Sequence, residues 1–297
     1  MRWLKSGHDI VKHRHSPQKL APLQGRRILC LCSHGEYSGT GTCPLCAFAV
    51  VGLIQRKKRI SSLLLSASAT DISKYNSATQ HPFLEAARAG SLDERLLSLW
   101  LSQDRIYAAH AYPRFIGSLI AKIPFASHHT IDSETEAWNQ RILSVLSYSL
   151  QNVVREARFF LDTAQKYGLD LGCWKERAAT KAYCAEMAHV ASWASLEEGL
   201  VFLWAMEKLY LDSWAFVSGG LSKQGDSRDI ASHAVREFAS NWTNEEFVNF
   251  VDDLRSIVDC LNIEVGSELW KRVQSVWDRV IELEIDFWPE SGEENQV

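Results

Sequence analysis

The sequence predicts an all-α protein whose folded part is a single helical-bundle domain of about eight helices. From about residue 75 onward, apolar residues recur at alternating three- and four-residue steps, which is the spacing of one helix face. Strand signals are absent after residue 70, because no alternating β-branched run lies between turn dipeptides there. A hydrophobic content of 46% in 297 residues is ample for a large core.

The first part of the chain differs in composition from the rest. Residues 1–72 mix Arg, Lys, His, Pro, Gly and Ser without a sustained period, so we expect a disordered basic extension. We expect the helical domain to span residues 73–290 and a flexible tail to follow at 291–297. Cys30-Leu31-Cys32 and Cys43-Pro44-Leu45-Cys46 resemble zinc-ligand spacings, but no surrounding pattern supports a zinc module, and we expect no metal site.

The distribution of charge and the length of the longest apolar run indicate which kinds of partner the protein can have. Residues 1–60 carry eleven Lys and Arg against two acids, a charge of +9, which leaves −13 on the remainder. An acidic body argues against a nucleic-acid partner. The apolar stretch 43–54 is about a dozen residues long, too short to cross a membrane. Seven unevenly spread cysteines suit a reduced protein. We therefore expect a cytoplasmic location, with organelle import as the alternative that the basic N-terminus leaves open.

The predicted helices have start and stop signals. Gly90, Pro124 and Gly168 end the first three, Ser91 opens the second as a cap, and Gly219-Gly220 is predicted to break the chain after the fifth. The eight helices are expected at 75–89, 92–123, 133–167, 175–192, 195–217, 226–241, 243–261 and 267–288.

Three acidic side chains interrupt the apolar stripes of three predicted helices. Asp104 lies in the second helix, Glu207 in the fifth and Glu284 in the last. An unpaired carboxylate taken out of water costs several kcal/mol, so each needs a partner from the protein or from a ligand. Together they predict a polar site inside the bundle. For Asp104 taken alone, a partly exposed ion pair with Arg105 or Arg114 is an equally good interpretation.

Four segments resemble one protein family, the TenA or thiaminase II-like proteins, which have the haem-oxygenase-like helical fold. The resemblance covers about residues 75–290 in the right order and implies that fold for this chain. The segments are His81-Pro82-Phe83-Leu84-Glu85-Ala86, Gly90-Ser91-Leu92, Trp100-Leu101-Ser102-Gln103-Asp104-Arg105-Ile106-Tyr107 and Glu284-Ile285-Asp286-Phe287-Trp288.

The resemblance implies roles for four residues. Asp104 would bind the amino-pyrimidine ring of thiamin fragments, and Tyr107 and Tyr183 would line and stack on that ring. Glu284 would be the acid that protonates the leaving group. An aspartate can accept from an exocyclic amine and a protonated ring nitrogen together, which compensates its burial.

The chain departs from the family pattern at one segment. Many family members carry a nucleophilic cysteine where this sequence has Met206, so the chain resembles the branch that lacks the cysteine, and covalent catalysis is in doubt. We expect the neighbouring Glu207 to position or deprotonate water. Tyr210 and Trp242 would complete the aromatic walls.

These features predict a hydrolase of thiamin-pyrimidine salvage, which removes the amine from a 5-aminomethyl pyrimidine or a derivative. We expect a small-molecule aminopyrimidine substrate and no cofactor, and the resemblance suggests a homo-oligomer such as a tetramer. One alternative is a non-catalytic helical binding or assembly module that kept the fold. Another is a di-iron oxidase built on Glu186 and His189, although such sites need two Glu-x-x-His motifs and the sequence has one.

Overall fold

The computed structural model describes residues 59–68, 72–221 and 230–295. Every regular element in these ranges is helical, which confirms the predicted all-α fold. The elements are α2 (Ile60–Ser68), α3 (Ile72–Thr79), α4 (Pro82–Ala89), α5 (Glu94–Ile106), the π-helix η1 (Tyr107–Ala111), α6 (Tyr112–Ala121), α7 (Glu134–Tyr167), α8 (Ala178–Trp193), α9 (Leu196–Leu221), α10 (Ile230–Thr243), α11 (Glu245–Cys260), α12 (Glu268–Phe287) and the 3₁₀ turn η2 (Glu293–Asn295).

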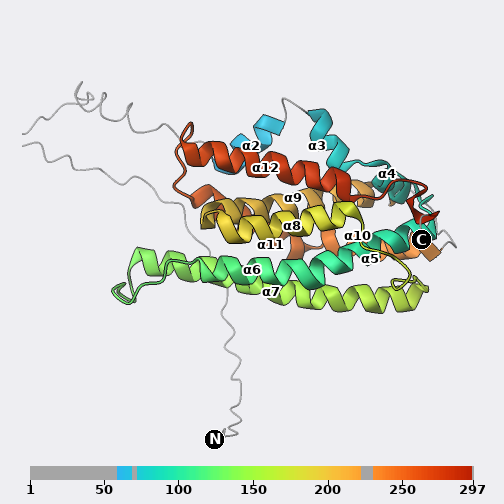
Figure 1. The fold of residues 1–297 in the computed structure, drawn as a ribbon, viewed down its shortest axis with the longest axis horizontal. Coiled ribbons are helices and arrows are strands. Elements are labelled where there is room, and N and C mark those ends of the chain that lie inside the picture. The colour runs from blue at the N-terminus through green and yellow to red at the C-terminus, as the bar shows by residue number, and fades with distance from the viewer. Residues whose placement is uncertain (1–58, 69–71, 222–229, 296–297) are drawn as a thin grey trace, which may run out of the picture. The chain divides into compact units, whose positions relative to one another are not determined.

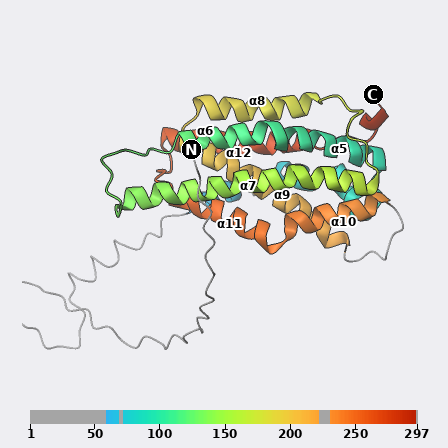
Figure 2. The same ribbon diagram turned by 90° about the horizontal axis from the view of Figure 1, so that it is seen from below.

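Helix α9 is the element around which the others are arranged. It contacts α3, α4, α10, α11 and α12, and α12, α8, α5–α6 and α7 run alongside one another (Figure 1, Figure 2). Every residue from Glu198 to Met206 is buried, because a helix that is apolar on all sides belongs in a core. Glu207, the next residue, therefore has its backbone in the interior of the bundle. None of the helices in the described ranges, α9 included, is long and apolar enough to cross a bilayer.

The first predicted helix, 75–89, is wrong as a single element. It is two helices, α3 and α4, which are separated by Gln80 and His81. Proline has no N–H to donate and suits the first helical position, so Pro82 starts α4. His81 is the cap, since its Nδ1 accepts from the Phe83 backbone N–H at 3.2 Å.

The predicted break at Gly219-Gly220 is also wrong, because α9 continues through both glycines to Leu221. A Cβ built on Gly220 would lie 2.9 Å from the backbone oxygen of Arg88, at the end of α4. The absence of a side chain therefore allows α4 to lie directly against α9. In the sequence a pair of glycines suggests a turn, but here the pair allows two helices to pack closely.

Helix α2 lies inside the range 1–72, for which the sequence predicts no regular structure. Its residues Ile60 and Leu64 are buried, and the helix contacts α3 and α11. A nine-residue helix gains most of its stability from such packing, which a sequence window does not show. The helical body thus begins before residue 73. Residues 1–58, with the two cysteine motifs, lie outside the described residues.

A tryptophan cluster, Trp100 with Trp214, Trp242 and Trp288, fills one end of the core. The ring centroids of Trp214 and Trp242 are 4.9 Å apart, and Trp100 lies 5.3 Å from Trp214, 6.1 Å from Trp242 and 6.2 Å from Trp288. All four side chains are fully buried, so each contributes a large apolar area to the core.

Candidate functional site

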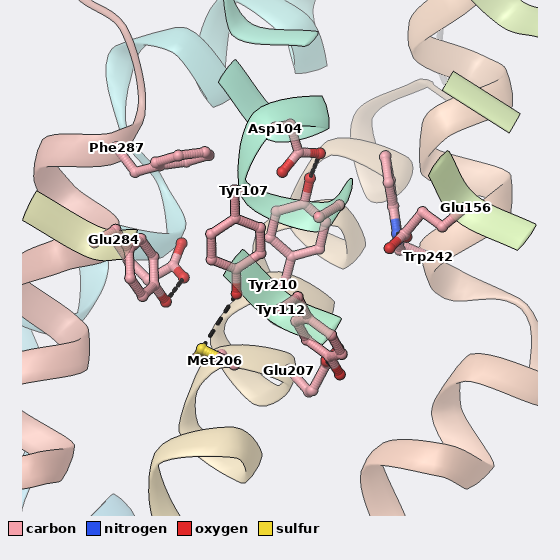
Figure 3. A pocket seen from close by; sticks show the side chains of 12 residues that line it. Asp104, Tyr107, Tyr112, Glu156, Met206, Glu207, Tyr210, Trp242, Glu284 and Phe287 are labelled. Atoms are coloured by element: carbon pink, nitrogen blue, oxygen red, sulfur yellow. Dashed lines mark hydrogen bonds between the residues drawn. The ribbon is translucent and has the colours of Figure 1, made fainter. Parts of the chain in front are cut away.

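A small, largely enclosed pocket lies in the interior and is lined by residues of α5, η1, α6, α7, α8, α9, α10 and α12 (Figure 3). Its volume of about 30 Å³ leaves room for very few water molecules. All seven residues that the sequence predicts for the site line it, and their chemical roles remain predictions. The lining residues are Asp104, Tyr107, Ala108, Tyr112, Glu156, Tyr183, Met206, Glu207, Tyr210, Trp242, Glu284 and Phe287.

The π-helix η1 brings a further tyrosine into this pocket. Its widened turn has a hydrogen bond from the Tyr112 N–H to the Tyr107 carbonyl, five residues back. Tyr107 and Tyr112 therefore share one face, whereas a regular α-helix would place Ala111 there. In the predicted helix 92–123, three- and four-residue steps from Asp104 lead through Tyr107 to Ala111, Phe115 and Ser118. Phe115 is buried, but Tyr112 and Leu119 are buried in place of Ala111 and Ser118. The extra residue of the π-turn is the physical reason.

Four carboxyl groups reach the pocket, and each accepts a hydrogen bond from an aromatic side chain (Figure 3). None of the lining residues is Lys, Arg or His, so no lining side chain can neutralise these acids by charge. The bonds run from Tyr210 to Asp104 (2.7 Å), from Tyr183 to Glu284 (2.6 Å), from Tyr112 to Glu207 (2.5 Å) and from the Trp242 indole to Glu156.

The hydrogen-bond partners decide between the two interpretations of Asp104. Its Oδ2 accepts from the Tyr210 hydroxyl, the residue is only 3% exposed, and no ion pair with Arg105 or Arg114 is present in the described part of the chain. The surface ion-pair interpretation is therefore wrong. Glu284 has a free acceptor as well, because its Oε2 is buried without a hydrogen-bond partner among the described residues. An unpaired buried oxygen is costly, so Glu284 presents a position for a donating ligand.

Burial controls the protonation of these acids. Loss of hydration raises the pKa of Glu284 and of Glu156 to about 7 and that of Glu207 to about 8. The pKa of Asp104 lies well above its usual range, chiefly because of burial and then because of the neighbouring Glu156 charge. The acids of this pocket therefore hold protons near neutral pH, and a cationic or donor-rich ligand is the partner that would allow them to ionise.

We expect the free energy of unfolding to depend on pH through Glu207. Its pKa is higher in the folded chain than the usual 4.5 of an unfolded one, so the folded state binds the extra proton and loses stability as pH rises from about 5 to about 8. The contribution is up to about 1.4 kcal/mol per pH unit. Thermal unfolding of the parent and of Glu207→Gln across this range measures it.

The difference between the two proteins isolates Glu207 from other groups. Burial lowers the pKa of His81, which gives a slope of opposite sign that both proteins share. The variant should lose less stability on going from pH 5 to pH 8. Parallel curves for parent and variant would mean that Glu207 is already ionised in the folded protein at pH 5.

The sequence missed Glu156 and Tyr112 as lining residues. A signal for Glu156 is present, because the buried stripe of α7 runs through Ser149, Val153 and Phe160, and Glu156 falls at the missing step between the last two. This is the same pattern of an acid inside an apolar stripe that identifies Asp104. No comparable signal marks Tyr112, since its position depends on the π-turn.

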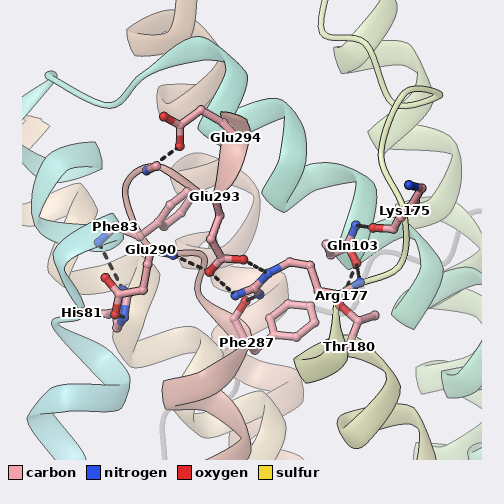
Figure 4. A network of polar contacts seen from close by, with 11 residues as sticks. His81, Phe83, Gln103, Lys175, Arg177, Thr180, Phe287, Glu290, Glu293 and Glu294 are labelled. Carbon is pink, nitrogen blue, oxygen red and sulfur yellow. Dashed lines mark hydrogen bonds and ion pairs between the residues drawn. The ribbon is translucent and has the colours of Figure 1, made fainter. Parts of the chain in front are cut away.

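The C-terminal clasp, which consists of Arg177 with Phe287, Glu290 and Glu293, joins the elements that carry the site (Figure 4). Arg177 forms two hydrogen bonds of 2.7 Å to the Glu293 carboxylate and donates to the Phe287 carbonyl at 2.6 Å. The backbone N–H of Glu290 also donates to Glu293 at 2.9 Å. The clasp thus links the start of α8 to the end of α12. Our sequence analysis predicted a flexible tail from residue 291, but residues 291–295 are held in place by the contacts of Glu293, the first residue of η2.

Gln103 extends this connection to α5. Its Oε1 accepts from the Arg177 N–H and the Thr180 hydroxyl, both at 2.8 Å, and its Nε2 donates to the Lys175 carbonyl at 3.1 Å (Figure 4). Gln103 is fully buried and directly precedes Asp104. The segments that carry Asp104, Tyr183 and Glu284 are therefore fixed to one another by paired polar groups.

Comparison with known proteins identifies the family. The model of the TENA/THI-4/PQQC family matches residues 69–295. The chain belongs to this family. The match includes every lining residue of the pocket and begins just before α3.

Two sequence relatives and one structure show how far the similarity of this TENA/THI-4/PQQC family member extends. A Fusarium pseudograminearum protein described as a probable transcription factor is 30% identical over 242 residues, 71% of this chain, and the chain spans about half (47%) of its length. A probable bifunctional TENA-E protein of Glycine max is 26% identical over 216 residues, 72% of this chain and 86% of its own. A TenA homologue from Pyrococcus furiosus has the same fold, with a TM-score of 0.64, 24% identity and coverage of 77% of this chain and 98% of its own.

The structure separates the predicted di-iron motif from the pocket. Glu186 and His189 line a surface groove between α8 and α12, and Glu186 pairs with Arg279 at 3.2 Å. Within the described ranges, no three His, Cys, Asp or Glu side chains are grouped so that they could hold a metal ion. The Glu-x-x-His segment of this family member therefore does not contribute to the interior site.

Proposed function

We propose that this chain hydrolyses a 5-aminomethyl pyrimidine of the thiamin type, or a derivative of it, and releases the amine. The observation that carries the proposal is an interior pocket with aromatic walls and four carboxyl groups, in which no lining side chain is basic. An aminopyrimidine matches it, because it offers a flat ring, an exocyclic amine and a protonated aminomethyl group. Membership of the TENA/THI-4/PQQC family supports a thiamin-related substrate.

Asp104 is the residue that we assign to the ring. Tyr210 occupies its Oδ2, which leaves the other oxygen for a ligand amine or a protonated ring nitrogen. A hydrogen bond to a charged group is stronger than a neutral one, so ligand binding would favour the ionised form of Asp104. Tyr107 and Tyr183, whose ring centroids are 5.0 Å apart, would form the aromatic wall beside the ring.

Glu284 and Glu207 are assigned to the reaction. The bound ammonium group would pass one proton to Glu284, which would return it to the neutral amine as the carbon–nitrogen bond breaks. Glu207 would take a proton from the water whose oxygen bonds to the same carbon. The products are a hydroxymethyl pyrimidine and ammonia, and a later proton exchange restores both acids. The pKa values of Glu284 and Glu207 are raised to about 7 and about 8, so either acid can carry a proton near neutral pH, and the proposed roles use the state in which Glu284 is protonated and Glu207 is ionised.

The direct test is the release of ammonia from a 5-aminomethyl pyrimidine by the full chain. Turnover by the parent, and its loss in both Glu207→Gln and Glu284→Gln, is the expected result. Binding of the pyrimidine without any turnover would instead favour the non-catalytic binding module. That alternative has one observation in its favour, since Met206 lines the pocket and offers no thiolate.

We expect Cys184→Ser to keep most of the activity, at least about half of the parent turnover, because surface or structural substitutions away from a site have small effects. Cys184 follows Tyr183 but does not line the pocket, and burial raises the pKa of its thiol to about 11. It is therefore protonated near neutral pH and a poor nucleophile. Steady-state assays of parent and variant, with unfolding curves as the control, measure this. Near-complete loss of turnover in a folded Cys184→Ser protein would transfer the nucleophile to Cys184.

A further inference from the structure

Glu156 borders two spaces. It lines the interior pocket, and it also lines a surface cleft of about 220 Å³ between α7 and the α10–α11 region. The surface grooves between α8 and α12 and beside the start of α8 share no residue with the pocket. The other residues of the cleft are Tyr148, Asn152, Arg155, Phe159, Asn241, Asn244, Glu246 and Phe247.

The interior pocket is much smaller than the surface cleft, so the side chains between them must move to admit a ligand. A pyrimidine ring is several times larger than the few waters that fit in a pocket of about 30 Å³, so a side chain must shift before the ring can enter. The cleft is large enough to receive the ring first. Glu156 lines both spaces, and Trp242, whose indole donates to Glu156, lines the pocket. Phe159 lines the cleft and lies edge-on to Trp242 at 6.3 Å.

Charge distinguishes the outer cleft from its inner end. At the rim, the guanidinium of Arg155 is 2.7 Å from Glu246 and 3.0 Å from the Asn152 oxygen, so this cation is already paired. No second cationic residue lines the cleft. Glu156 is thus the ionisable group at the inner end, followed by the acids of the pocket. An ammonium group that leaves water on this route would meet a carboxyl group at each step.

We propose that ligands enter the pocket through the α7–α10 cleft and that Glu156 is the specificity-determining residue of this route, which favours ligands with a protonated amine. The inference rests on the proposed function, because the class of ligand is taken from it. In the closed pocket Glu156 accepts from Trp242, and on entry its carboxylate accepts from the ammonium of the ligand. The indole is then free to move aside.

Bulky substitutions test the route. Asn152→Phe on α7 and Asn241→Phe on α10 each fill the cleft from a different wall, and Ser275→Phe adds the same bulk to the α8–α12 groove as the control. Binding of a 5-hydroxymethyl pyrimidine, which has no amine at this position to release, is followed by surface plasmon resonance on the full chain. We expect the association and dissociation rate constants of both cleft variants to fall together by about tenfold or more.

The dissociation constant should change by less than about threefold, because neither variant touches the bound ligand. Ser275→Phe should behave as the parent. Two variants on different helices guard against a folding defect in one, and their unfolding curves identify such a defect. A ligand that enters at the parent rate in both folded cleft variants would overturn the route.

A charge substitution tests the selectivity. Glu156→Gln keeps the shape and the acceptor for Trp242 but removes the carboxylate. We expect the association rate constant of a 5-aminomethyl pyrimidine to fall by about tenfold, within the range of electrostatic steering, and that of the neutral 5-hydroxymethyl pyrimidine to change by less than about threefold. The aminomethyl ligand is measured on proteins that also carry Glu284→Gln, so that turnover does not remove it.

The outcomes separate this inference from the proposed function. If the parent binds both pyrimidines and Glu156→Gln slows them equally, the selectivity assigned to Glu156 is wrong while the proposed function stands. If the parent binds neither pyrimidine, the proposed function fails, and the assigned ligand class and route fail with it.

Discussion

Glu284→Gln is expected to lower kcat on a 5-aminomethyl pyrimidine by about 10²–10⁴-fold, the usual contribution of a general acid. Glutamine has the shape of glutamate and still accepts from the Tyr183 hydroxyl, so the pocket should remain intact. It has no acidic proton for the leaving amine. KM should change much less than kcat, because the lost interaction belongs to the transition state. Steady-state ammonia release measures both constants.

Asp286→Asn is the matched control for this substitution. Asp286 lies on α12 two residues after Glu284, but its side chain is exposed and does not line the pocket. The control should retain the parent kcat. A Glu284→Gln protein with nearly full turnover would remove Glu284 from the reaction and leave it as a residue that only binds the ligand or supports the fold.

Asp104→Asn is expected to weaken pyrimidine binding by about 1.5–3 kcal/mol, or roughly 10–150-fold in Kd, as for a hydrogen bond to a charged group. The amide oxygen can still accept from Tyr210, so folding should survive. Isothermal titration calorimetry of the two proteins with a 5-hydroxymethyl pyrimidine measures the loss without interference from turnover.

The stability of the same variant carries separate information. The pKa of Asp104 is raised by burial, so an ionised Asp104 costs the folded state stability as pH rises, and asparagine removes that cost. The empty Asp104→Asn protein should therefore be at least as stable as the parent at pH 8. A destabilised variant that binds pyrimidine normally would make Asp104 a structural residue and remove the main support for a pyrimidine site.

The sequence predicts the site better where local periodicity alone places a residue. Asp104, Glu207 and Glu284 each interrupt an apolar stripe, and the structure brings all three to one pocket. Tyr112 could not be found this way, because the extra residue of the π-turn breaks the three- and four-residue spacing that identifies the other site residues. Glu156 interrupts an apolar stripe, as Asp104 does. It was nevertheless missed, because α7 is 34 residues long and carries polar and apolar side chains along its whole length.

The fold, too, is predicted only in part from local sequence. Apolar periodicity predicts the helical body, whereas the helix ends depend on contacts between distant segments. Gly219-Gly220 reads as a turn in the sequence, yet α4 lies against it and keeps it helical. In the same way α2 packs against α11, and residues 291–295 are held because Arg177 pairs with Glu293. These partners are far apart in sequence, so no local pattern contains them.

The tryptophan cluster gives this pocket an optical readout. Indoles whose centroids are 4.9–6.2 Å apart exchange excitation energy, so light absorbed by Trp100, Trp214 or Trp288 can reach Trp242. Trp242 is also a wall of the pocket, and Tyr210 meets it edge-on at 5.0 Å. A ring that enters beside Trp242 should change the emission of the whole cluster and its near-ultraviolet circular dichroism. Occupancy of the pocket could then be followed in the unmodified protein without a label.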